Sequence, residues 1–291
     1  MALDTPVALF LFNRPEPTAR VFARIAEARP RQLFLIADGP RTEVERVRCE
    51  AARHAVGRID WDCDVRRNFS DDNLGCRVRM SSGIDWVFSQ VEEAILLEDD
   101  CLPHPTFFPF CAELLARFGE DERIVMISGD NFQRGRRRTP FSYYFSRIPH
   151  VWGWATWRRA WRHYDVTMSR WPALRDARWL EATLGDADVA RAYRRLFDDT
   201  HAGKIDTWDY QLTLAAWQHE ALTLLPEVNL VSNLGFGPDA THTKACNSPD
   251  AALPVQPMAF PLRHPQHVRR CVEADDFTFE TSFRIRRQSA A

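Results

Sequence analysis

The segment "AILLEDDCLPHP" (residues 94–105) joins an apolar run to a cluster of acids. Four apolar residues lead directly into Glu98, Asp99 and Asp100, and Pro103 ends the run. Short continuous apolar runs are typical of strands that are buried on both faces of a parallel sheet. Three adjacent carboxylates repel one another, so a positive charge must offset them. The segment therefore predicts a central strand whose carboxyl end carries a charged site.

Strand and helix signals alternate over the first 130 residues. The predicted strands cover residues 7–12, 32–39, 62–69, 94–100 and 123–130, and the predicted helices cover 18–28, 77–91 and 105–118. This alternation predicts βαβ units, hence an α/β fold with a mostly parallel, mixed central sheet and helices on both faces. Ligands bind such sheets at the carboxyl ends of the strands. The polar pairs 13–14 and 38–39 follow two of these strands, so we expect them to share one site with the acidic triplet.

The sequence changes character after residue 140. Four tryptophans lie between residues 152 and 161, and the spacing of those at 154, 157 and 161 predicts a helix with an apolar stripe. Further helices are predicted at 188–199 and 206–220, and a late strand within 221–236. We interpret residues 1–262 as one domain with halves 1–130 and 131–262, followed by a C-terminal tail at 263–291.

Composition limits the class of protein. The 291 residues are 45% hydrophobic and 27% charged with a net charge of −2, the profile of a soluble globular protein without a basic field for nucleic acid. Seven cysteines without a CxxC pair predict free thiols in a reducing compartment. With no signal-like or membrane-spanning segment, we expect a cytoplasmic protein. The basic run "RGRRR" (134–138) fits a solvated loop or a contact with an anionic acceptor or lipid headgroup.

The acidic triplet has three interpretations. It forms an acidic turn paired with arginines, a general acid–base pair, or a site for a hard cation. Adjacent residues on a strand point to opposite faces, so neighbouring carboxylates seldom converge on one atom as an acid–base pair. Mg²⁺ and Mn²⁺, in contrast, accept one or two carboxylates and take their other ligands from water and substrate phosphates.

A series of motifs along nearly the whole chain carries a family resemblance. In order they are "FNRP", "ADGPR", "NLGC", "LEDDCLP", "FF", "SYYFS" and "WGWATW". The chain resembles a bacterial family of nucleotide-diphospho-sugar transferases, some labelled haemolysin-like, with the GT-A (Rossmann-like) fold. It is more distantly similar to the N-acetylglucosaminyltransferase that initiates complex N-glycans. The resemblance implies a metal-dependent, inverting glycosyltransferase that moves a sugar from a nucleoside diphosphate sugar, a UDP-sugar favoured, to an acceptor hydroxyl in surface polysaccharide or lipopolysaccharide synthesis.

The resemblance also implies roles for individual residues, with residues 1–130 as the nucleotide-sugar half and 131–262 as the acceptor and catalytic half. Asp100 would be the direct ligand of Mn²⁺ or Mg²⁺, and Asp38 would accept the N3–H of a uracil. The further candidates for the metal are Glu98, Asp99 and His242. The other residues expected at the nucleotide sugar are Asn13, Arg14, Arg77, Asp99, Gly153, Trp154 and Thr241. Arg79 fits a solvated side chain equally well.

The candidate general base is Asp209 in "IDTWDYQL" (205–212), with Asp206 as the alternative. Asp206 also fits the N-cap of the helix that follows, which favours Asp209 for catalysis. The loop "GFGPDATHT" (235–243) is expected to be a lid over the diphosphate or, equally, an ordinary surface loop.

Two other functions stay open. A sugar-1-phosphate nucleotidylyltransferase shares the sheet topology, but it should carry a glycine-rich basic loop after the first strand, and "FNRPEPTAR" (12–20) has no glycine. A non-catalytic protein that binds nucleotide sugars or glycans is the second. The expected partners are a nucleotide-sugar donor and a glycan or lipid-linked acceptor, with association with the inner face of the membrane left open.

Overall fold

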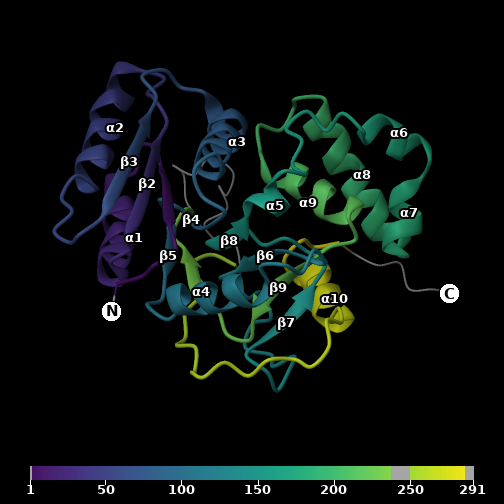
Figure 1. Ribbon diagram of the computed structural model, residues 1–291. Coiled ribbons are helices and arrows are strands. Elements are labelled where there is room, and N and C mark those ends of the chain that lie inside the picture. Colours follow the sequence, from purple (N-terminus) through teal and green to yellow (C-terminus); the bar gives the residue numbers. More distant parts are fainter. Residues whose placement is uncertain (1, 237–249, 286–291) are drawn as a thin grey trace.

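The structure is a computed structural model and describes residues 2–236 and 250–285 of the chain. Its strands are β1 (Val7–Leu11), β2 (Gln32–Ala37), β3 (Asp64–Phe69), β4 (Glu93–Glu98), β5 (Cys101–Pro103), β6 (Ile124–Ser128), β7 (Tyr143–Ser146), β8 (Trp154–Trp157), β9 (Leu222–Pro226) and β10 (Val231–Asn233). Eight of them form the central sheet in the order β3-β2-β1-β4-β8-β6-β9-β7, and β10 pairs with β5 (Figure 1).

The direction of the strands confirms the predicted mostly parallel, mixed sheet. β3, β2, β1 and β4 run parallel, β8 is antiparallel to both β4 and β6, and β7 is antiparallel to β9. The chain leaves β1 on one side for β2 and β3 and returns on the other side for β4. This reversal of strand order opens a crevice at the carboxyl ends of β1 and β4, where α/β sheets bind their ligands.

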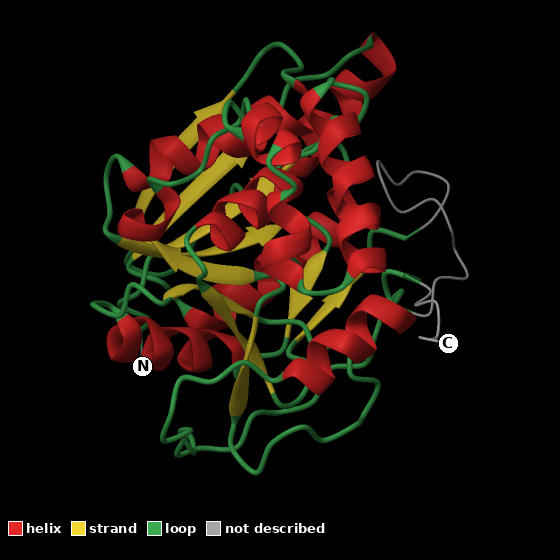
Figure 2. Cartoon of the chain, turned by 90° about the vertical axis from the view of Figure 1, so that its right-hand side faces the viewer, coloured by secondary structure: helices red, strands yellow, loops and turns green. Residues whose placement is uncertain are grey.

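Helices cover both faces of the sheet (Figure 2). They are α1 (Pro15–Ala28), α2 (Glu43–Ala55), α3 (Gly75–Phe88), α4 (Phe107–Phe118), α5 (Arg158–Trp161), α6 (Trp171–Asp176), α7 (Trp179–Leu184), α8 (Ala187–His201), α9 (Asp209–Gln218) and α10 (Val272–Thr281). Alternate residues of a strand point to opposite faces. Accordingly Leu9 of β1 packs in the core with α1 and α4, whereas its neighbour Phe10 packs in a second core with α3.

The five strands predicted in the first 130 residues all exist, with both ends within two residues of the prediction. The helix predicted around the tryptophans is wrong in its first half. Trp154–Trp157 is strand β8, inserted between β4 and β6, and only Arg158–Trp161 is helical. A short, fully buried strand has the same continuous apolar character as a buried helix, and tertiary pairing decides between them.

The helices α6, α7, α8 and α9 gather beside the sheet around a core of their own (Figure 1). The predicted tail contributes α10, which packs on β7: the buried Asp275 accepts hydrogen bonds from Ser146 Oγ at 2.5 Å and from the backbone N–H of Arg147 at 3.2 Å. The division of the chain at residue 262 stays a prediction.

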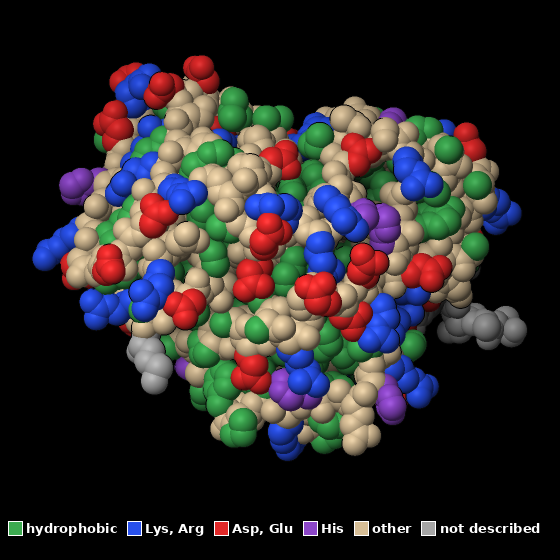
Figure 3. Space-filling model, viewed as in Figure 1, with side chains coloured by type: hydrophobic (Ala, Val, Ile, Leu, Met, Phe, Trp, Pro, Cys, Tyr) green, Lys and Arg blue, Asp and Glu red, His purple; other side chains and the backbone are tan. Residues whose placement is uncertain are grey.

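On the face shown in Figure 3, acidic and basic side chains are interspersed, so neither sign dominates this face. Within residues 2–236 and 250–285, no helix combines the length and the apolar character needed to cross a membrane.

Candidate functional site

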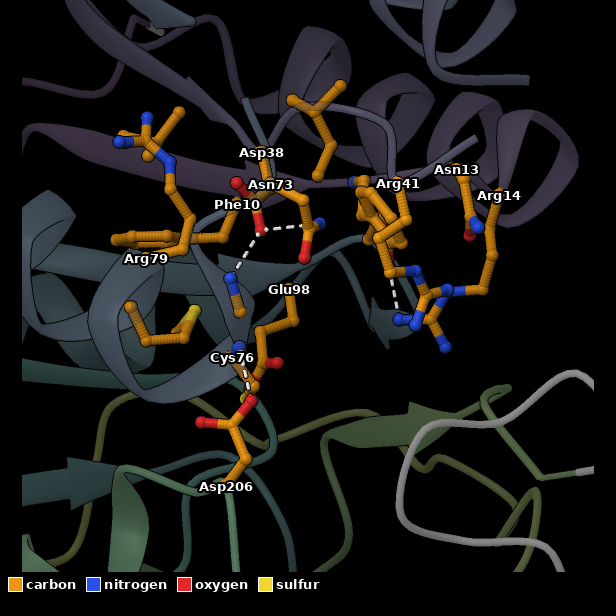
Figure 4. A pocket seen from close by; sticks show the side chains of 16 residues that line it. Phe10, Asn13, Arg14, Asp38, Arg41, Asn73, Cys76, Arg79, Glu98 and Asp206 are labelled. Carbon is orange, nitrogen blue, oxygen red and sulfur yellow. Dashed lines mark hydrogen bonds and ion pairs between the residues drawn. The ribbon is translucent and has the colours of Figure 1, made fainter. Parts of the chain in front are cut away.

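A cavity of about 180 Å³ lies at the carboxyl ends of β1, β2 and β4, against the N-terminus of α3. Its lining comprises Phe10, Leu11, Phe12, Asn13, Arg14, Ile36, Asp38, Arg41, Asn73, Gly75, Cys76, Arg79, Met80, Glu98, Asp99 and Asp206. Figure 4 shows Asn13 and Arg14 at one end, Phe10 and Arg79 at the other, and Glu98 between them. Of the polar residues predicted to share one site, Asn13, Arg14, Asp38, Glu98 and Asp99 line this cavity, and Gly39 and Asp100 are not among its lining residues.

Arg14 joins the two aspartates of the acidic triplet. Its Nη2 lies 2.5 Å from Oδ1 of Asp99, and its Nη1 lies 2.7 Å from Oδ2 of Asp100. The other oxygen of Asp99 accepts the backbone N–H of Phe12 at 3.0 Å, so this carboxylate also fixes the turn that follows β1. Without a bound ligand, the guanidinium of Arg14 therefore supplies positive charge that offsets the two aspartates.

The triplet is crowded and mostly buried, which makes its charge costly. Burial raises the pKa of Glu98, and the neighbouring charges of Asp100, Asp99 and Asp209 add to the rise against the opposing effect of Arg14. Burial also raises the pKa of Asp99. Burial by itself would lower the pKa of Arg14, but the three carboxylates of the triplet raise it above its ordinary value. A further cation near Asp100 would relieve this repulsion.

Asp38 lies at the carboxyl end of β2, as predicted, but it caps the N-terminus of α3. Its Oδ1 accepts the backbone N–H groups of Gly39 and Leu74, both at 2.9 Å. Its Oδ2 accepts Nδ2 of Asn73 at 3.0 Å and the backbone N–H of Gly75 at 3.2 Å. A carboxylate has about four acceptor positions. All of them are used within the protein, so none is left for the imide of a uracil in this arrangement.

Asp206 caps the same helix from the opposite side. Its carboxylate accepts the backbone N–H groups of Cys76 at 3.0 Å and Arg77 at 3.2 Å. The predicted N-cap role at α9 is therefore wrong, because Trp208 occupies that position and makes no side-chain cap. Gly75, with φ of +79°, lets the chain pass close to the carboxylate, since a Cβ there would lie 2.9 Å from Oδ2 of Asp206. Asp38 and Asp206 together satisfy the first four N–H groups of α3.

Asp209 is the first residue of α9 and is not among the residues that line the cavity. Its Oδ1 accepts the hydroxyl of Thr207 and the backbone N–H of Tyr210, the latter at 3.0 Å. Its charge is one cause of the raised pKa of Glu98, so the two groups are near each other. Of the two carboxylates considered as base, Asp206 is committed to α3, whereas Oδ2 of Asp209 has no hydrogen bond within the described residues.

The remaining predicted nucleotide-sugar residues divide into two groups. Asn13 lines the cavity and donates to Oε1 of Glu45 at 3.1 Å. Arg77 is not among the lining residues, and its guanidinium Nε lies 3.8 Å from Asp206. Thr241 and His242, together with most of the predicted lid, lie outside the described residues.

Gly153 directly precedes β8 and Trp154 begins it, and β8 pairs with β4, the strand that leads into the triplet. Trp154 is 1% exposed and stacks on Trp208 with ring centroids 5.5 Å apart, so neither face of its ring is open to a sugar. We therefore do not retain Trp154 as a sugar contact. Gly153 has φ of +69°, and a Cβ there would lie 2.8 Å from Val231, which explains the glycine through packing.

The candidate cation site has carboxylates but is blocked by Arg14. The described residues contain no group of three or more His, Cys, Asp or Glu side chains arranged for a metal ion. Mg²⁺ and Mn²⁺ need only one or two carboxylates when substrate phosphates complete the shell, and Asp100 meets that requirement. A Cβ on Gly235 would lie 1.9 Å from Oδ2 of Asp100, so the chain packs directly on the ion pair. The donor set fits a hard cation once Arg14 leaves Asp100.

Sequence reasoning missed the part of the cavity that α3 supplies. Cys76, Arg79 and Met80 line it, and Gly83 follows one turn later, where a Cβ would lie 2.6 Å from the ring of Phe10. The i, i+3, i+4, i+7 spacing of these four positions is the signal that they share one helix face. Arg79, which fitted a solvated side chain, is 7% exposed.

Comparisons with known proteins give weak likenesses. No family model matches the chain. No curated protein matches it either. Among solved structures, 4-diphosphocytidyl-2C-methyl-D-erythritol synthase from Anaerococcus prevotii is 7% identical, with a TM-score of 0.33, over 55% of this chain and 75% of its own.

Two structures of UDP-glucose pyrophosphorylase are each 8% identical to this chain. The complex with UDP-glucose has a TM-score of 0.28 over 50% of this chain and 64% of its own. The apo structure has a TM-score of 0.36 over 76% of this chain and 90% of its own. Likenesses of this size do not assign a function, which is argued below from the geometry of the site.

Proposed function

We propose that the protein is a glycosyltransferase that takes a sugar from a nucleoside diphosphate sugar, with a UDP-sugar favoured, and transfers it to an acceptor hydroxyl. The observation that carries the proposal is the cavity at the reversal of strand order, whose lining includes Arg14, Glu98 and Asp99. Arg14 also pairs with Asp100, and the charge of Asp209 acts on Glu98. Crevices at this position of an α/β sheet bind nucleotides. The motifs quoted above support a glycan or lipid-linked acceptor in surface polysaccharide or lipopolysaccharide synthesis, in the cytoplasm or at the inner face of the membrane.

The two ends of the cavity suit the two ends of a nucleotide. Phe10, Ile36 and Met80 give one end an apolar wall for a base. Asn13 and Arg14 at the other end supply donors for a diphosphate, and a guanidinium is well shaped to bind phosphate oxygens. An Mn²⁺ or Mg²⁺ ion held by Asp100, with Asp99 and Glu98 beside it, would act as a Lewis acid on the departing diphosphate.

Asp209 is the proposed general base. In an inverting transfer, the acceptor oxygen forms a bond to the anomeric carbon while the bond from that carbon to the diphosphate breaks. The hydroxyl proton passes to a carboxylate on the opposite side from the leaving group. Asp209 has Oδ2 for this proton, and Thr207 and Tyr210 hold its Oδ1 in place.

An assay of donor turnover tests the proposal. We expect the protein with Mn²⁺ to release UDP from at least one UDP-sugar, slowly with water as acceptor and faster with a glycan or lipid-linked acceptor. The Asp209→Asn variant should bind the donor and release no UDP. Binding without turnover of any donor would indicate a non-catalytic binding protein, and formation of a nucleotide sugar from a nucleoside triphosphate and a sugar-1-phosphate would indicate a nucleotidylyltransferase.

A further inference from the structure

Arg79 is a buried cation that makes no salt bridge within the part of the chain that the structure describes. It is 7% exposed, and its hydrogen bonds within the described residues go only to the backbone and side-chain oxygens of Asn68, the latter at 3.1 Å. Both bonds use Nη2, and Nε is buried with no acceptor. Burial lowers the pKa of Arg79, and the positive charge of Arg53 adds to this effect, against the opposing charge of Asp38. Most of its guanidinium donors are therefore unused.

Arg79 is one of the residues that line the cavity, so a ligand bound there would lie near its side chain. Arg79 lines the cavity beside Phe10, at the end away from Arg14 (Figure 4). The wall there is apolar, with Ile36 and Met80, and suits a flat ring better than a hydrated phosphate. Buried charges without partners are rare in proteins because they are costly, and they often mark binding sites.

We propose that Arg79 recognises the base of the nucleotide by donating hydrogen bonds to a carbonyl oxygen of the ring. The proposal rests on the proposed function and adds the element that selects the base. Asp38, the carboxylate expected to accept an imide N–H, has its acceptor positions filled by donors of the protein, namely Gly39, Asn73, Leu74 and Gly75. Selection by a donor favours bases that carry a ring carbonyl, namely uracil, cytosine and guanine, over adenine, which has none.

The chain contains a matched control in Arg53. Its Nη2 donates to the backbone oxygens of Asp38, at 3.1 Å, and Ser70, at 2.5 Å, and its buried Nε also lacks an acceptor. Arg53 is not among the residues that line the cavity. Replacing either arginine with methionine removes a guanidinium from the same region, but only one replacement removes donors from the cavity.

The test is calorimetric titration of UDP, CDP, GDP, ADP and pyrophosphate, each with Mn²⁺, into wild type, Arg79→Met and Arg53→Met. We expect at least one of the first three to bind wild type about tenfold or more tighter than ADP, as a hydrogen bond to a charged donor would give. Arg79→Met should lose this preference while pyrophosphate binds unchanged. Arg53→Met should keep the preference.

The outcomes separate the two proposals. If ADP binds wild type as tightly as the other three nucleotides, or if Arg79→Met keeps the full preference, the role of Arg79 is wrong and the proposed function stands. If neither nucleotides nor pyrophosphate bind wild type, the proposed function fails as well. Arg79→Met is not required to refute the proposal, because the four nucleotides are also compared on wild type. If Arg79→Met does not fold, that comparison still tests the proposal.

Discussion

Nη1 of Arg14 lies 2.7 Å from Oδ2 of Asp100, so the guanidinium occupies the carboxylate that we propose as the metal ligand. The same guanidinium binds Asp99, and the backbone of Gly235 packs against the pair. A divalent ion bound by Asp100, as proposed, would therefore compete with Arg14 for this oxygen. A diphosphate would resolve the competition, because it gives the displaced guanidinium a new anion.

The first prediction concerns this competition. Arg14→Gln should bind Mn²⁺ without nucleotide about tenfold more tightly than wild type, equivalent to ~1.4 kcal/mol, because the competing cation is gone. Electron paramagnetic resonance of free Mn²⁺ measures this directly. Arg41→Gln is the control, since Arg41 lines the same cavity but pairs with Glu45. Equal Mn²⁺ affinity in wild type and Arg14→Gln would show that Arg14 does not block the ion.

The second prediction concerns the general base. Asp209→Asn should lower kcat for sugar transfer by about 10²–10⁴-fold, the usual contribution of a general base, with the donor Kd unchanged. Steady-state kinetics and donor titration measure the two quantities. The account of Asp209 is wrong if transfer continues at the wild-type rate.

The third prediction concerns Asp38. Asp38→Asn should lower the free energy of unfolding by about 1–3 kcal/mol. The amide replaces one carboxylate oxygen by an NH2 group, which cannot accept hydrogen bonds, so two of the four donors that now bind Asp38 would lose their acceptor. Urea denaturation measures the loss. A variant that unfolds like wild type but no longer binds UDP would instead place Asp38 at the base.

The fourth prediction concerns Asp206. Asp206→Ala should lower the free energy of unfolding by about 1 kcal/mol through loss of a helix cap. Because Asp206 also lines the cavity, the variant should have a higher KM for the donor, while sugar transfer continues at saturating donor. Thermal unfolding and the transfer assay check this together. Loss of transfer in a protein of nearly wild-type stability would return Asp206 to the list of candidate bases.

Much of the fold was predictable because its strands are buried on both faces. The continuous apolar runs at 7–11 and 33–37 leave few alternatives to parallel strands, and the polar residues after them mark the edge where such sheets bind ligands. The short strand Trp154–Trp157 escaped prediction because three tryptophans at helical spacing occur equally well when a strand meets a helix.

The site was less predictable because its partners are far apart in the sequence. Asp206 fits a local N-cap, yet it binds the backbone of Cys76, 130 residues away. The sequence places Asp38 at a strand end but does not show that Leu74 and Gly75 fill its acceptor positions. Helix periodicity puts Arg79 on the face of α3 toward the sheet, but only the packing shows that its hydrogen bonds among the described residues go to Asn68 and not to a carboxylate.

The most direct test of the central claim is calorimetric titration of UDP into wild type and Asp100→Asn, each with Mn²⁺ and with EDTA. The account predicts that UDP binds wild type with Mn²⁺ and that EDTA or the substitution abolishes or strongly weakens binding, because Asp100 holds the ion that meets the diphosphate. Equal UDP binding in all four titrations would contradict the metal–diphosphate site. Failure of UDP, CDP and GDP alike to bind wild type would contradict the nucleotide site itself.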